Sequence, residues 1–205
     1  MHHNINRLVV LIGVLAFSLN AQPRNITLSA KGGSSATRHS RSALAKRKFI
    51  NLLLNGEYYN SENYGSGEGP FRLHNGKCKP RASDWVSPDS SYVEATIMLP
   101  PILYDFDHDD KDDALVLLGE NFGGSGYFIS INIMLNKNGA PIFTATKTLG
   151  DRIEIDSITV VKDTISVYSV VHGPNDPMAW VTMPYVFKLV FQNKSLAFVD
   201  GTHSN

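Results

Sequence analysis

The residues with the clearest chemical potential form one acidic segment, residues 105–113, which reads DFDHDDKDD. It places six carboxylates and one lysine within nine positions. Four of the carboxylates follow the pattern D-x-D-x-D-x-x-x-D, whose first, third, fifth and ninth positions are Asp105, Asp107, Asp109 and Asp113. This spacing can fold oxygens around one hard cation, and a bound Ca²⁺ would relieve the repulsion between charges this close. These four residues are therefore the candidate ligands of a structural Ca²⁺.

The acidic segment departs from an EF-hand loop. Its sixth position is Asp110 where that loop has glycine, and its twelfth is Val116 rather than a bidentate glutamate. The runs on either side also have the pattern of strands rather than helices. The alternative is a solvated turn in which the Asp side chains accept hydrogen bonds from their own backbone amides. The pattern leaves both interpretations open.

His172 is the weaker candidate for chemistry, because it ends an apolar run and precedes the loop GPNDP. It could act as a general base or a metal ligand, or simply close a strand by bonding a loop carbonyl. A hydrolase would need His172, the acidic segment and the pair Asp151 and Arg152 to converge in one cleft. The glycine-rich run at residues 123–126 lacks the lysine of a phosphate loop and predicts a hairpin turn.

The fold that positions these residues is predicted to be mainly β. Apolar and polar residues alternate in short runs, which are separated by turn-forming Gly, Asn, Asp and Pro. Strands are expected at residues 92–99, 114–118, 127–135, 142–149, 152–161, 165–171, 180–191 and 196–199. Because the links are mostly only about two to five residues long, the prediction is an antiparallel meander forming a sheet or sandwich.

One amphipathic helix is expected before the strands, at residues 42–55. Its apolar stripe consists of Ala45, Phe49, Leu52 and Leu53. Ser42 is placed to cap this helix and Gly56 to end it. Residues 22–41, rich in Ser, Gly and Arg, are predicted to be a flexible linker. The folded part is therefore expected to be a single β-rich domain, residues 42–200.

Residues 1–21 have the pattern of a secretory signal peptide. Arg7 precedes an apolar run of about ten residues, and small residues follow as candidate cleavage sites. The run is too short for a membrane-spanning helix. The sequence thus predicts an exported protein, periplasmic or secreted, with no membrane-spanning segment after processing.

The overall composition narrows the classes of partner. The 19 basic and 19 acidic residues cancel, so no nucleic-acid partner is expected. Cys78 is the only cysteine, which excludes a disulfide framework and a CxxC site. A buried thiol is the simplest interpretation of Cys78, and an intermolecular bridge is the alternative.

Several of these segments together resemble a family of small exported bacterial proteins of unknown function. Residues 104–117, YDFDHDDKDDALVL, are similar to the GDLDGDGKEDAAVVL type of segment in that family. Similar stretches occur at residues 120–126, 149–152 and 172–178. The acidic loop also resembles the calcium loops of FG-GAP and VCBS repeats and the LppP/LprE-like lipoproteins. The resemblance implies an envelope location and no established reaction.

The chain departs from this family in two places. His108 and Asp110 replace the glycines of the loop, and Ala179 and Trp180 stand where the family tends to have a cysteine pair. The resemblance therefore implies no thiol or disulfide role at that position.

Three hypotheses about function follow. The first is a non-catalytic exported β-domain that binds a partner or an envelope component, with the acidic segment as a structural, calcium-loaded corner. The second is an envelope hydrolase that uses His172 with nearby acids. The third is an inhibitor or accessory factor of an envelope enzyme, which an exposed apolar or aromatic patch would favour. Tyr58, Tyr59 and Tyr64 are the best candidates for such a patch, although packing against the sheet is the use that the sequence favours for them.

Overall fold

The computed structural model of the chain describes residues 34–59, 61, 70–79, 94–177 and 180–199, with side chains from residue 42 onward. The predicted signal peptide lies outside the described residues.

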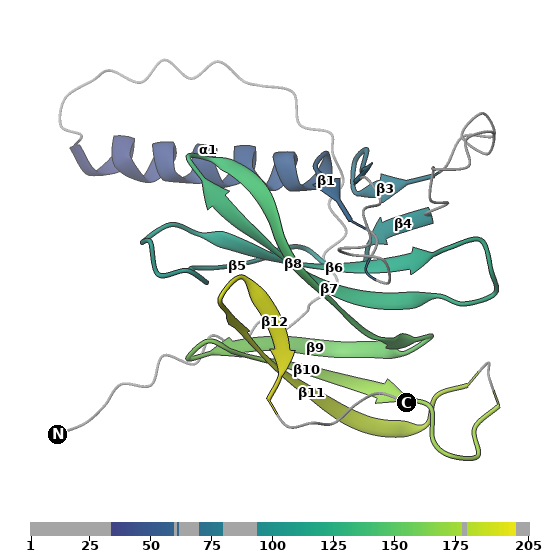
Figure 1. The fold of residues 1–205 in the computed structure, drawn as a ribbon. Helices are drawn as coiled ribbons and strands as arrows, with labels where there is room; N and C mark the ends of the chain where they lie inside the picture. Colours follow the sequence, from purple (N-terminus) through teal and green to yellow (C-terminus); the bar gives the residue numbers. More distant parts are fainter. Residues whose placement is uncertain (1–33, 60, 62–69, 80–93, 178–179, 200–205) are drawn as a thin grey trace, which may run out of the picture.

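The described residues form three layers (Figure 1). Helix α1 (Ser34–Leu54) lies on one face of a six-stranded sheet, here called the central sheet, and a four-stranded outer sheet packs on the other face. The central sheet contains β3 (Lys77–Cys78), β4 (Glu94–Ile97), β5 (Ile102–Tyr104), β6 (Asp113–Asn121), β7 (Phe128–Lys137) and β8 (Ala140–Asp151). The outer sheet contains β9 (Glu154–Val161), β10 (Thr164–Val171), β11 (Met183–Gln192) and β12 (Ser195–Phe198). A hairpin of β1 (Glu57–Tyr58) and β2 (Phe71–Arg72) follows α1.

All strand pairs are antiparallel, which confirms the predicted mainly β fold with one helix. Each of the eight expected strands is present. β4 and β5 both pair with β6, and Pro100 and Pro101 lie between them because proline cannot donate to the ladder. At the hairpin turns Asn138, Asp163 and Asn193 adopt positive φ, as tight hairpins between right-twisted strands require.

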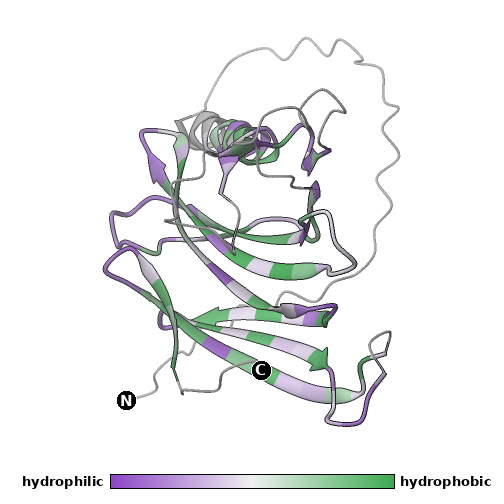
Figure 2. Cartoon of the chain, turned by 45° about the vertical axis from the view of Figure 1, so that its right-hand side comes forward, coloured by the Kyte–Doolittle hydropathy of each residue, from purple (hydrophilic) through white to green (hydrophobic). Residues whose placement is uncertain are grey.

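β6 and β7 are buried on both faces because the central sheet has a layer on each side. Figure 2 shows that many residues of the strands are hydrophobic, and the core between the central and outer sheets includes Ile129, Ile131 and Phe187. The face toward α1 packs against a second core that includes Phe49 and Leu53. Successive side chains along a strand point to opposite faces of the sheet, so β6 and β7 contribute side chains to both cores.

Helix α1 differs from the prediction at its start. It begins at Ser34, inside the segment predicted as linker, because no glycine or proline interrupts the chain after Gly33 until Gly56. Ala45, predicted to face the sheet, is exposed, whereas Phe49 and Leu53 are buried. Among the helix residues whose side chains are described, those from Phe49 onward contribute to the core.

Candidate metal centre

The hairpin of β5 and β6 positions the acidic segment. Tyr104 pairs with Asp113 across the two strands, so residues 105–112 form the connecting loop, here called the Asp loop. Phe106 anchors this loop, since its side chain is buried against Phe191 in the core between the sheets. The loop is thus fixed at both ends and at one point inside.

Three of the four predicted ligands come together. Asp105, Asp107 and Asp109 each offer one carboxylate oxygen, and these oxygens lie within 4.8 Å of one another. Asp105 is held in place because its two oxygens accept the backbone N–H groups of Asp109 (3.0 Å) and Asp110 (2.9 Å). The arrangement could hold a hard cation, which takes oxygen ligands.

The sixth position of the loop makes the turn without glycine. Asp110 has φ 62° and His108 has φ 57°, both in the left-handed region. Asp visits this region more readily than most residues, because its short side chain can bond locally. The missing glycine therefore does not prevent the folded shape of the loop.

The fourth predicted ligand, Asp113, has a different place. Its side chain is fully buried, and one oxygen accepts the N–H groups of Phe106 (2.9 Å) and Asp107 (3.3 Å). The other oxygen accepts the N–H of Asn136 (2.7 Å), at the start of the next turn. Burial raises the pKa of Asp113, against the opposing effect of these N–H donors. Asp113 ties the loop to the central sheet and lies outside the oxygen cluster of Asp105, Asp107 and Asp109.

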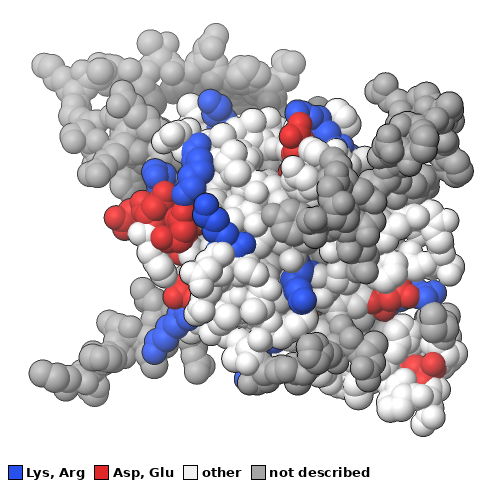
Figure 3. Space-filling view, in the orientation of Figure 1, with Lys and Arg blue, Asp and Glu red and all other residues white. Residues whose placement is uncertain are grey.

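Two lysines neutralise the cluster. Lys137, beside the β7–β8 turn, places Nζ 2.6 Å from Asp107 Oδ2 and 3.8 Å from Asp109 Oδ2, and this contact with Asp107 raises the pKa of Lys137. Lys111 places Nζ 2.7 Å from Asp109 Oδ2, and its hydrogen bond lowers the pKa of Asp109. Figure 3 shows the acidic patch with lysines at its border.

One oxygen of the cluster remains unsatisfied. Asp107 Oδ1 is buried and has no hydrogen-bond partner among the described residues. A buried carboxylate oxygen without a donor costs free energy, so such an atom calls for a ligand or a water. It is the observation in this loop that fits a cation best.

The Asp loop also joins the three layers. Lys46 of α1 lies 2.8 Å from Asp112. Asp163, in the β9–β10 turn of the outer sheet, accepts the hydroxyl of Tyr104 at 2.9 Å and lies 3.3 Å from His108 Nε2. The acidic hairpin therefore has direct contacts with α1 and with the outer sheet.

His172 lies far from the Asp loop. β6 and β10 both start at the Asp-loop end of the molecule, and β10 ends immediately before His172 at the opposite end. Eight residues of strand separate the two ends by roughly 25 Å. Asp151 and Arg152, which form an ion pair, lie at the His172 end, because Asp151 pairs with Phe128. The three groups required for the hydrolase hypothesis are thus divided between the two ends.

The surroundings of His172 are those of a structured turn. Asp176 accepts the N–H of Gly173 (2.7 Å) and the hydroxyl of Thr182 (2.9 Å), and these bonds lower the pKa of Asp176. Nε2 of His172 is buried and has no hydrogen-bond partner within the described part of the chain. At residues 123–126 the side chain of Asn121 bonds the backbone, which agrees with the predicted turn.

The tyrosines considered for an exposed patch pack within the fold instead, which is the use that the sequence favoured. Tyr58 is fully buried and Tyr59 contacts the ring of Phe143, while Tyr64 lies outside the described residues. Cys78 is half-buried on β3 and packs against the helix-facing core. Neither tyrosine forms an exposed aromatic surface.

Sequence reasoning missed the basic partners of the Asp loop. Lys137 stands in the turn sequence NKNG, which predicts only a hairpin. Lys46 and Asp163 lie more than forty residues away along the chain on either side, and no local pattern links them to the loop. The pairing of the strands and the packing of α1 and the outer sheet on the central sheet bring these residues together.

Comparisons of the chain with protein-family models, curated proteins and solved structures found no match. The family resemblance of the acidic segment therefore stays a prediction. Within the described residues, no helix is long and apolar enough to cross a membrane.

Proposed function

We propose that this chain is an exported, non-catalytic β-domain protein, periplasmic or secreted, that binds a partner or an envelope component and holds a structural Ca²⁺ in its Asp loop. The observation that carries the calcium proposal is the oxygen cluster of Asp105, Asp107 and Asp109 together with the unsatisfied buried oxygen of Asp107. Ca²⁺ takes six to eight oxygens, so waters and backbone carbonyls would complete its ligands.

A dication would replace the lysines as the neutralising charge. Lys137 and Lys111 each supply a single positive charge, and both side chains are about half exposed. Their ammonium groups can therefore swing into water when an ion enters. Ca²⁺ suits the loop better than Mg²⁺, because Mg²⁺ demands a strict octahedron and sheds its water reluctantly.

The outer sheet supports the partner-binding part of the proposal. Tyr168 and Val186 lie opposite one another on β10 and β11, and their side chains are 42% and 38% exposed. Trp180, which precedes β11, and Met183, its first residue, are exposed as well. Exposed aromatic and apolar side chains are typical of interaction surfaces.

Calcium should raise the melting temperature of the protein. The ion binds the folded loop and hardly binds the unfolded chain, so stability should rise by about 2.7 kcal/mol at a concentration 100 times the dissociation constant. Differential scanning calorimetry in chelator and in millimolar CaCl₂ measures the shift, and MgCl₂ should give a smaller one. The double variant Asp107→Asn with Asp109→Asn should lose the calcium response.

The control for this experiment is Asp156→Asn, which removes an exposed carboxylate from β9 in the outer sheet. It should keep the full calcium response. Identical melting curves of the wild-type protein in chelator and in calcium would show that the Asp loop is a solvated turn.

Export is tested separately. Expression of the native gene should give a processed form, shortened at the N-terminus by about 18 to 21 residues, outside the cytoplasm. Cell fractionation followed by N-terminal sequencing measures both properties. Recovery of only the full-length protein from the cytosol would contradict the proposal.

A further inference from the structure

Helix α1 contains an exposed basic stretch before the part that packs in the core. Every side chain from Ser42 to Lys48 is exposed, and Phe49 is the first buried one among the helix side chains that the structure describes. Most helices in proteins are stabilised by an apolar face that packs against the fold, because a short helix gains little from its own hydrogen bonds. Burial in the core therefore does not account for the sequence of this stretch.

The charges of α1 do not stabilise the helix itself. Its sequence contains no Asp or Glu, and its last turn contains no basic residue. Cations stabilise a helix when they lie near its C-terminus or one turn from an acidic residue of the same helix, and neither arrangement occurs here. The lysines and arginines all come before the residues that pack in the core, and they are Arg38, Arg41, Lys46, Arg47 and Lys48.

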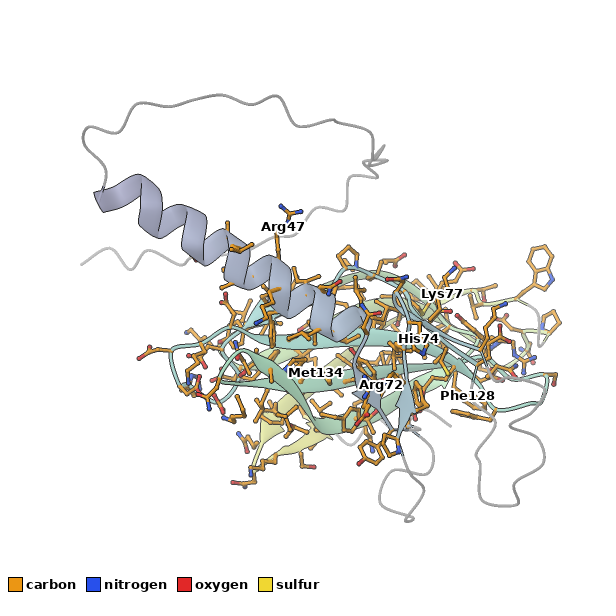
Figure 4. All side chains as sticks on the ribbon, turned by 90° about the horizontal axis from the view of Figure 1, so that it is seen from above. Arg47, Arg72, His74, Lys77, Phe128 and Met134 are labelled. Carbon is orange, nitrogen blue, oxygen red and sulfur yellow. The ribbon has the colours of Figure 1, made fainter. Side chains whose placement is uncertain are left out.

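Leu44, Arg47 and Lys48 share one face of the helix, here called the basic face. Their spacing of i, i+3 and i+4 makes them neighbours on the helix surface. Leu53, which is buried in the core, follows Leu44 by about two and a half helical turns, so the basic face points away from the central sheet. Figure 4 shows Arg47 projecting outward from α1, away from the side chains of the strands.

The basic face combines unpaired positive charge with exposed apolar surface. Arg47 and Lys48 have no acidic partner among the described residues, whereas Lys46, on the side toward the sheet, pairs with Asp112. Leu44 is 68% exposed and lies between the two cations on the helix surface. A soluble polyanion would use the charges alone. An anionic membrane would use both features, because its phosphates attract lysine and arginine and its interface accepts an apolar side chain.

We propose that the basic face of α1 binds the surface of an anionic phospholipid membrane. Leu44 enters the headgroup region, and Arg47 and Lys48 contact the lipid phosphates. This inference names an envelope component for the proposed function, and rests on that function only for access to a membrane. The basic face includes no residue of the Asp loop, so its failure would leave the calcium and export proposals standing.

The test measures co-sedimentation of the full chain with phosphatidylcholine vesicles, with and without phosphatidylglycerol, at low salt and in chelator. The ratio of the two partition constants is compared, because the apolar run at residues 8–17 is common to all variants. The anionic vesicles should bind more tightly. Arg47→Gln with Lys48→Gln should reduce that binding about 30-fold, since each charge near such a surface contributes about fivefold. Leu44→Ala should reduce it several-fold.

Two control variants separate charge from structure. Arg47→Lys with Lys48→Arg keeps both charges and should bind as the wild-type protein does. Lys188→Gln with Lys194→Gln removes two exposed lysines from β11 and the β11–β12 turn of the outer sheet, with the same change in net charge, and should leave the ratio unchanged. The glutamine variant of α1 should keep the wild-type melting temperature, because both positions are exposed and glutamine is a good helix former.

Three results would overturn the proposal: equal binding to both kinds of vesicle, a wild-type ratio for the glutamine variant of α1, or an equal loss for the outer-sheet variant. A fourth would reassign the basic face to a soluble polyanion: Leu44→Ala binds the anionic vesicles as the wild-type protein does, and inorganic polyphosphate binds as tightly as those vesicles.

Discussion

Asp113→Ala should lower the free energy of unfolding by about 3–5 kcal/mol, the largest loss expected from any single residue of the acidic segment 105–113. The carboxylate accepts three backbone N–H groups, from Phe106, Asp107 and Asn136, and is fully buried. Alanine leaves all three donors without their acceptor and opens a space beneath the loop. Urea unfolding followed by circular dichroism measures the loss.

The matched control is Asp112→Ala at the neighbouring position. Asp112 is partly exposed and pairs with Lys46 at the surface, so its loss should cost about 0–1 kcal/mol. Asp113→Asn should fall between the two, because the amide keeps one acceptor oxygen but turns an N–H donor toward another donor. A cost below about 1 kcal/mol for Asp113→Ala would show that the N–H groups find other acceptors.

The strands could be predicted from the sequence because burial on one or two faces imposes a period of two. The run from Phe128 to Leu135 places isoleucines at every second position, and these are the residues buried between the sheets. The hairpin turns could also be predicted from the sequence, since Asn138 and Gly139 supply the left-handed backbone that a tight turn needs.

The features that the sequence did not reveal depend on distant contacts. Two-residue strands such as β1 and β3 are too short to show any period. The apolar stripe of α1 predicted Ala45 in the core, but whether a helical turn is covered depends on how far the sheet extends beneath it. Likewise, Asn132 and Thr146 have the pattern of ordinary strand residues until the register places them side by side.

The two interpretations of the acidic segment describe different carboxylates of one loop. Asp105 and Asp113 accept backbone N–H groups, as a self-capping turn would predict. Asp107 and Asp109 bond lysines instead, and their charges are what a cation would use. Asp113 only caps the backbone, whereas Asp105 caps it and also lies in the oxygen cluster with Asp107 and Asp109.

Lys137→Met should have opposite effects on the metal-free and the calcium-loaded protein. Without calcium, Asp107 and Asp109 lose a shared positive charge, so their mutual repulsion should lower the melting temperature. With calcium, no ammonium group competes for Asp107 Oδ2, so affinity should rise several-fold. Isothermal titration calorimetry and melting curves in chelator and in calcium measure the two effects. Lys188→Met, which removes an exposed lysine from β11, should change neither. A calcium affinity that Lys137→Met leaves unchanged, or weakens, would mean that the lysine and the ion do not compete for the same oxygens.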